Sequence, residues 1–136
     1  MFDKVIVVVM NNMNKKGSFT PQERKNFILK TTYNLPNVEV DIYDGLLASY
    51  AKSKNACAII KGLRAMSDFE YEFQMALANK RLNPDIETLF LTTSAENMYL
   101  SSSMVKQIAG MGGDISYFVP AEIHDDIIKK ISSKKD

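Results

Sequence analysis

The stretch IIKGLRAMSDFEYEFQM, residues 59–75, decides the fold of this 136-residue chain. The apolar run at residues 56–60 predicts a buried strand, and residues 61–66 predict a short loop. A helix is then expected to begin at Ser67, because Ser67 and Glu70 have the spacing of a capping box. The order strand, loop, helix is typical of one unit of a parallel α/β sheet.

Two cations flank a glycine in the predicted loop: Lys61 and Arg64 on either side of Gly62 and Leu63. In open α/β sheets, ligands bind at the carboxyl ends of the strands. Gly62 lacks a side chain, so a phosphate could approach the backbone closely. The loop therefore predicts an anion site. From these residues alone, two solvated surface cations without a role are an equally good interpretation.

Working outward, the same alternation runs through the whole chain. Apolar or alternating runs predict strands at residues 5–9, 38–42, 56–60 and 86–92. Capping and stop signals predict helices at residues 20–33, 46–54, 67–82 and 101–112, and a last helix from Pro120. The β-branched first run predicts a strand that is buried on both faces. We expect one α/β domain over residues 1–136, a doubly wound parallel sheet with helices on both faces.

The composition of the chain argues against several classes of protein: nucleic-acid-binding, membrane-bound and disulfide-stabilised. The formal net charge is +1, so bulk electrostatics favours neither nucleic acid nor membrane as a partner. No apolar run approaches the ~18 residues of a membrane span. The single cysteine, Cys57, excludes an internal disulfide, is typical of a reducing compartment, and is expected in the core of a strand. No signal peptide precedes the first strand, so we expect a cytoplasmic protein.

A second candidate anion site is the serine run Ser101, Ser102 and Ser103, which is predicted to open a helix. Hydroxyls, backbone N–H groups and the positive end of a helix dipole together suit a phosphate. Plain N-capping is the alternative, and one serine suffices for it. The only histidine, His124, is interpreted as a surface residue.

Two of these stretches carry a family resemblance. The sequences KGLRAMSDFEYE at residues 61–72 and LSSSMVK at residues 100–106 resemble bacterial phosphopantetheine adenylyltransferase, of the nucleotidyltransferase superfamily, at the spacing which that family shows. Weaker matches lie at residues 19–24 and 45–47. The resemblance implies a Rossmann-like fold and the transfer of an adenylyl group from ATP to 4′-phosphopantetheine, which gives dephospho-coenzyme A and pyrophosphate.

The resemblance also implies roles for individual residues. Lys15 and Arg64 correspond to catalytic positions, although Lys16 is close enough to be confused with Lys15. The implied phosphopantetheine-binding residues are Lys15, Leu47 and Lys61. The implied ATP-binding residues are Gly62, Leu63, Arg64, Glu72, Asn97, Met98, Tyr99, Leu100, Ser101, Ser102 and Ser103.

Three of these assignments have alternatives or departures. Leu47 is equally well interpreted as a core leucine. Glu72 would ordinarily be interpreted as a solvent-facing helix residue, and the resemblance is what assigns it to the ATP site. The family usually has arginine at the position of Lys61, and lysine keeps the charge but loses the bidentate fork.

Beyond the substrates, the resemblance implies Mg²⁺ carried on the ATP phosphates, coenzyme A as a feedback ligand and a homohexamer. No metal-ligand cluster is recognised in the sequence.

The family's opening strand, glycine turn and Thr/His-x-Gly-His helix are not found in these 136 residues. The residues around Met1 resemble the end of that helix, so we expect an N-terminal truncation relative to the family. Two other hypotheses stay open: a protein that binds pantetheine, coenzyme A or nucleotide without transfer, and a generic α/β regulatory module.

Overall fold

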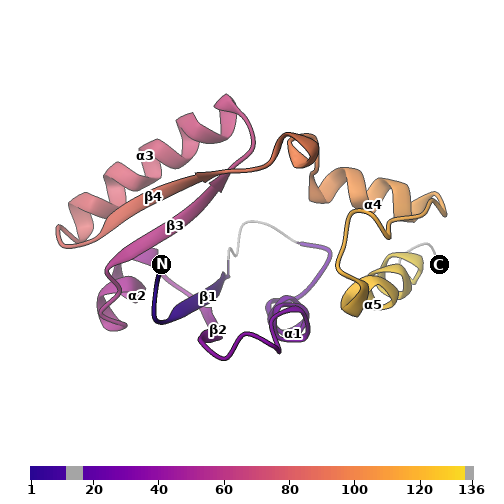
Figure 1. Cartoon of the computed structure of the whole chain (residues 1–136), viewed down its shortest axis with the longest axis horizontal. Coiled ribbons are helices and arrows are strands. Elements are labelled where there is room, and N and C mark those ends of the chain that lie inside the picture. Colours follow the sequence, from indigo (N-terminus) through magenta and orange to yellow (C-terminus); the bar gives the residue numbers. More distant parts are fainter. Residues whose placement is uncertain (12–16, 134–136) are drawn as a thin grey trace. The chain divides into compact units, whose positions relative to one another are not determined.

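The computed structural model describes residues 1–11 and 17–133, and it divides into two compact units (Figure 1). The first unit comprises Met1–Asp44 and Leu100–Asp136, and the second comprises Gly45–Tyr99. Strands and helices alternate, and the strands form two parallel pairs. This confirms the predicted Rossmann-like α/β class, while the prediction of one domain over residues 1–136 stays a prediction. Among the described residues, no helix has the length and apolar character that crossing a membrane requires.

In the first unit, β1 (Val5–Met10) runs parallel to β2 (Val38–Tyr43), with Val5 opposite Val38 and Met10 opposite Tyr43. The prediction that β1 is buried on both faces is wrong for this structure, because Val9 is its only fully buried residue. Within the described part of the chain, β1 pairs with β2 alone, so one edge of the strand lacks a neighbour.

Helix α1 (Pro21–Thr31) begins as its sequence predicts. The Thr20 hydroxyl accepts the Glu23 backbone N–H at 3.1 Å, and the Glu23 carboxylate accepts the Thr20 backbone N–H at 2.7 Å. Pro21 occupies the first helical position, where its missing N–H costs nothing. The predicted capping box is therefore confirmed, and it fixes the start of α1 beside the strand pair.

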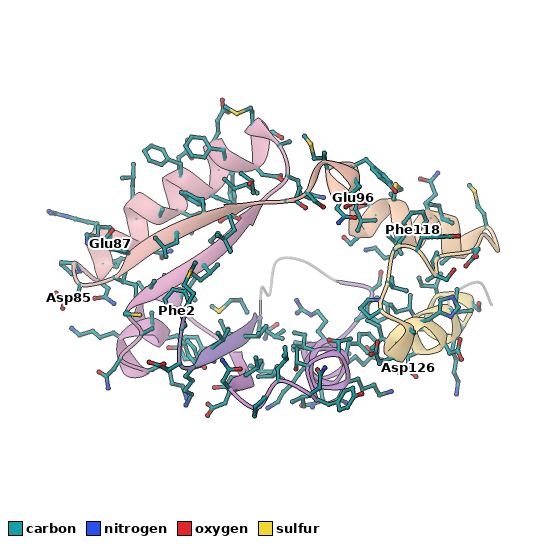
Figure 2. The ribbon with its side chains drawn as sticks, in the orientation of Figure 1. Phe2, Asp85, Glu87, Glu96, Phe118 and Asp126 are labelled. Atoms are coloured by element: carbon teal, nitrogen blue, oxygen red, sulfur yellow. The ribbon has the colours of Figure 1, made fainter. Side chains whose placement is uncertain are left out.

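The core of the first unit lies among α1, α4 (Ser102–Gly110) and α5 (Ala121–Ser132). Its buried residues are Val105, Ala109, Ile115 and Ile127. Partly buried aromatic residues extend the cluster; the rings of Phe19 and Phe27 meet edge-on, with centroids 5.2 Å apart. Ion pairs join α1 to α5: Lys30 with Asp126, and Glu23 with Lys130. Of these four residues, Figure 2 labels Asp126.

The second unit contains α2 (Leu47–Ser53), β3 (Ala58–Leu63), α3 (Met66–Leu82), β4 (Glu87–Thr92) and the 3-10 turn η1 (Ala95–Asn97). Strands β3 and β4 are parallel, and α3 lies along them (Figure 1). The Phe69 ring stacks on Phe73 at 5.5 Å and meets Phe90 of β4 edge-on at 5.8 Å. A small buried cluster joins Ala51 of α2 to Ile59 of β3 and to Ile86, which precedes β4.

Three local predictions for this unit are wrong. Lys61, Gly62 and Leu63 belong to β3 rather than to a loop, because pairing with β4 continues to Leu63 opposite Thr92. Helix α3 begins at Met66 with Ala65 as its N-cap, and no side chain caps it, so the Ser67 capping box does not form. Cys57 is exposed, because it precedes the strand instead of lying within it.

Candidate functional site

Lys61 faces helix α3 because of its register in β3. It lies opposite Phe90 of β4, and directly opposed residues of parallel strands point to the same face of the sheet. Phe90 contacts Phe69 of α3, so this face is the one that α3 covers. The Lys61 Nζ accordingly lies 3.2 Å from the Glu72 carboxylate.

Arg64 follows β3 directly and is held by Asp68, which lies in the first turn of α3. One carboxylate oxygen of Asp68 accepts both the Arg64 backbone N–H and its Nε–H, each at 3.2 Å. The other oxygen lies 3.5 Å from the Arg64 Nη2. The side-chain hydrogen bond from Arg64, followed by its backbone N–H, lowers the pKa of Asp68 below its ordinary value. Asp68 therefore stays ionised and fixes both the turn and the guanidinium.

Gly62 lies on the exposed face of β3, opposite Leu91. A Cβ added to Gly62 would meet no other described atom within 4 Å, so packing does not require glycine here. The backbone beside it is open to a close approach by a ligand. Leu63 is partly buried, and its carbonyl accepts the Thr93 backbone N–H at 2.9 Å.

The serine run opens helix α4, as predicted. Ser101 is the N-cap, and its hydroxyl accepts the Met104 backbone N–H at 3.2 Å. Ser102 and Ser103 are the first two helical residues, and both are exposed. One serine thus performs the capping, while the other two present hydroxyls at the positive end of the helix.

The remaining predicted site residues occupy varied environments. Leu47 is partly buried against the cluster of Ala51, Ile59 and Ile86, as the core interpretation expects. The Asn97 side-chain amide donates to the Ser94 hydroxyl at 3.0 Å, and Met98 and Tyr99 are exposed. Leu100 packs against the core of the first unit. Lys15 lies outside the described residues.

Sequence reasoning missed Asp68, and for Glu72 the structure differs from the solvent-facing alternative. Asp68 was not singled out, although its spacing from Arg64, four residues, is that of a helical ion pair. The Glu72 side chain, 20% exposed, faces Lys61 rather than open solvent. His124, interpreted as a surface residue, has a 30% exposed side chain and lies 2.8 Å from the Asp125 carboxylate.

The second unit therefore carries two ion pairs that join the end of β3 to the first two turns of α3. Lys61 and Arg64 supply fixed positive charge, and Glu72 and Asp68 hold them. Fixed cations beside an exposed, side-chain-free strand residue suit a phosphate-bearing ligand. They can neutralise charge that develops on phosphoryl oxygens.

Comparisons with known proteins connect this geometry to a family. A model of the cytidylyltransferase-like family matches residues 1–108. A phosphopantetheine adenylyltransferase from Clostridium tetani is 56% identical over 134 residues, which cover 98% of this chain and 84% of the relative. Another, from Caldanaerobacter subterraneus subsp. tengcongensis, is 56% identical over 96% of this chain and 81% of the relative. A third, from Clostridium botulinum strain Eklund 17B, is 54% identical over 96% and 82%.

Proposed function

This chain belongs to the phosphopantetheine adenylyltransferases of the cytidylyltransferase-like family, and on that premise we propose how its residues serve adenylyl transfer in coenzyme A biosynthesis. The phosphate of 4′-phosphopantetheine attacks the α-phosphorus of ATP. A new P–O bond forms, the bond to the leaving pyrophosphate breaks, and the products are dephospho-coenzyme A and pyrophosphate. No protein nucleophile is needed, so the protein positions the two substrates and neutralises charge.

The pairing of Lys61 and Arg64 with α3 is the observation that carries this proposal. Both cations are held at the carboxyl end of a parallel strand, where ligands of α/β proteins bind. In the proposed reaction, Arg64 neutralises charge on the ATP phosphates, and Lys61 contacts the phosphate of phosphopantetheine. Lys15 is proposed to contact both substrates.

The other predicted residues complete the proposal. Leu47 is proposed to contact the pantetheine arm. Gly62, Leu63 and Glu72 are proposed to bind ATP, together with the residues that surround the start of α4: Asn97, Met98, Tyr99, Leu100, Ser101, Ser102 and Ser103. The exposed hydroxyls of Ser102 and Ser103 support this, because a helix N-terminus favours a phosphate.

Several further properties are proposed from the resemblance. Among residues 1–11 and 17–133, no three His, Cys, Asp or Glu side chains group as a metal site requires. We therefore place Mg²⁺ on the ATP phosphates, where it would offset their negative charge. A cytoplasmic location, a homohexamer and feedback by coenzyme A are also proposed.

The test is to incubate the chain with ATP, Mg²⁺ and 4′-phosphopantetheine, and to measure pyrophosphate and dephospho-coenzyme A. Equimolar release of both products, dependent on both substrates, is the expected result. Saturable binding of both substrates without release would favour the alternative of a binding protein. Failure of ATP, phosphopantetheine and coenzyme A alike to bind would contradict both and revive the generic α/β module.

A further inference from the structure

Asp68 and Glu72 lie one turn apart on α3, and each holds a different cation of the site. We propose that these two carboxylates are positioning residues: Asp68 orients Arg64 before ATP binds, and Glu72 orients Lys61 before phosphopantetheine binds. This inference rests on the proposed function, in which both cations contact substrate phosphates.

The packing of α3 fixes where these carboxylates point. Phe69 and Phe73 form a neighbouring row on the helix, one residue further along than Asp68 and Glu72. This aromatic row is anchored on β4 through Phe90. With the aromatic row anchored on the sheet, the acidic row next to it is directed at the end of β3, where Lys61 and Arg64 lie.

The ion pairs themselves are poorly suited to stabilising the fold. The side chains of Lys61 and Arg64 are 37% and 45% exposed, and ion pairs with that much access to water contribute little to stability. The stacked Phe69 and its contact with Phe90 attach α3 to the sheet without them. We therefore infer that the carboxylates act on the orientation of the two cationic side chains rather than on the stability of the fold.

Each carboxylate cancels one positive charge, so the acidic pair lowers the net attraction of this site for an anion. The compensating benefit is that the pair fixes the orientation of the two cationic side chains. Lysine and arginine side chains lose much rotamer entropy when a ligand orders them. A side chain that is already held loses less, so ligand affinity rises. Asp68 goes further, since it also binds the Arg64 backbone N–H and so fixes the turn that carries the guanidinium.

The experiment measures ATP affinity in Asp68→Asn and 4′-phosphopantetheine affinity in Glu72→Gln, because Arg64 is proposed to contact ATP and Lys61 to contact phosphopantetheine. Glu70→Gln, at an exposed acid of the same helix, is the control for both ligands. Each substitution removes one negative charge, so general electrostatics predicts tighter binding in all three. Positioning predicts that Asp68→Asn and Glu72→Gln bind these ligands about threefold to tenfold more weakly, the effect of ordering one long side chain. Weakened binding only in these two variants, with unchanged melting temperatures, is the expected result. Equal or tighter binding in those two would overturn the inference.

A double-mutant cycle separates positioning from general structural damage. In an Arg64→Ala background, Asp68→Asn should have no further effect on ATP affinity, because Asp68 acts through Arg64. A full additional loss in that background would contradict the positioning role. The same cycle applies to Glu72→Gln in a Lys61→Ala background, with 4′-phosphopantetheine affinity as the measured quantity.

An NMR readout keeps the test independent of ATP binding. Exchange of the Arg64 Nε–H with water should be slow in the wild type and fast in Asp68→Asn. If the wild type binds no ATP, the proposed function fails, while the exchange rates still decide whether Asp68 holds the guanidinium. Identical exchange in both proteins would overturn the inference even where ATP binds.

Discussion

The apolar cluster of the first unit and the charged strand–helix junction of the second unit are interaction networks of opposite kinds. The first unit closes around an apolar cluster in which Ile115 is fully buried. The second unit has a smaller buried cluster, and its described strand–helix junction carries partly exposed charges, each paired with an opposite charge. Burial stabilises a fold, whereas exposed ion pairs stabilise it little. We therefore expect substitutions in the apolar cluster of the first unit to change stability, and substitutions at the charged junction of the second unit to change ligand binding.

The largest expected effect comes from Ile115→Ala in the first unit. Ile115 is 0% exposed, so truncation leaves a cavity and should lower the free energy of unfolding by about 2–5 kcal/mol. Urea denaturation measures it. The control is Ile60→Ala in β3, where the side chain is 40% exposed and the expected loss is about 1 kcal/mol or less. Equal losses of unfolding free energy in the two variants would contradict the expectation that burial of Ile115 makes its truncation the more destabilising.

Arg64→Ala should show the reverse pattern. Removing a charged hydrogen-bonding group from the ATP contact should weaken ATP binding about tenfold or more. Stability should change by about 1 kcal/mol or less, because the ion pair with Asp68 is partly exposed. Calorimetric titration measures the affinity, and Arg81→Ala, an exposed arginine at the end of α3, is the control. Similar affinity in the two variants would contradict the assignment of Arg64.

The serines at the start of α4 allow an effect on stability to be distinguished from an effect on ATP binding, because different serines are expected to produce them. Ser101→Ala removes the N-cap and should cost about 1 kcal/mol of stability. Ser102→Ala should leave stability nearly unchanged yet weaken ATP binding, since its hydroxyl makes no cap. Thermal melts and ATP titrations of both variants measure this. A Ser102→Ala protein with wild-type ATP affinity would leave N-capping as the sole role of the run.

The smallest expected effect is a pH dependence in the first unit. The side-chain hydrogen bond from Lys130, and then the Thr20 backbone N–H, lower the pKa of Glu23. A lowered folded-state pKa gives stability that is complete above the unfolded pKa, about 4.3, and is lost as pH falls through the folded value. Glu23→Gln should therefore lose less stability than the wild type between neutral pH and pH ~3. Parallel pH profiles of the two proteins would refute this.

Much of the fold could be predicted because its signals are local. The apolar runs located β1 to β4 within a few residues, and Thr20-Pro21 located the start of α1. The equally local Ser67 signal failed, because β3 extends to Leu63 by pairing with β4, and α3 begins at Met66. Strand pairing is a long-range property that capping patterns do not report.

The sequence predicted the cations of the candidate site but not their ion-pair partners on α3. Lys61 and Arg64 stand out beside Gly62, whereas the contact between Lys61 and Glu72 depends on how α3 packs against β3. The Asp68 contact is local, because Asp68 lies four residues after Arg64, which precedes the first residue of α3 by two residues. Its spacing could have revealed it, whereas the Glu72 contact follows from tertiary geometry, which the spacing of charges alone does not determine.

The most direct test of the central claim is an ATP titration followed by backbone amide NMR shifts across the chain. We expect saturable shifts at Lys61, Gly62, Leu63 and Arg64, which inorganic tripolyphosphate reproduces in part and which Arg64→Ala reduces. Saturable ATP binding with no shift at these four residues would contradict the claim that the end of β3 binds the ATP phosphates.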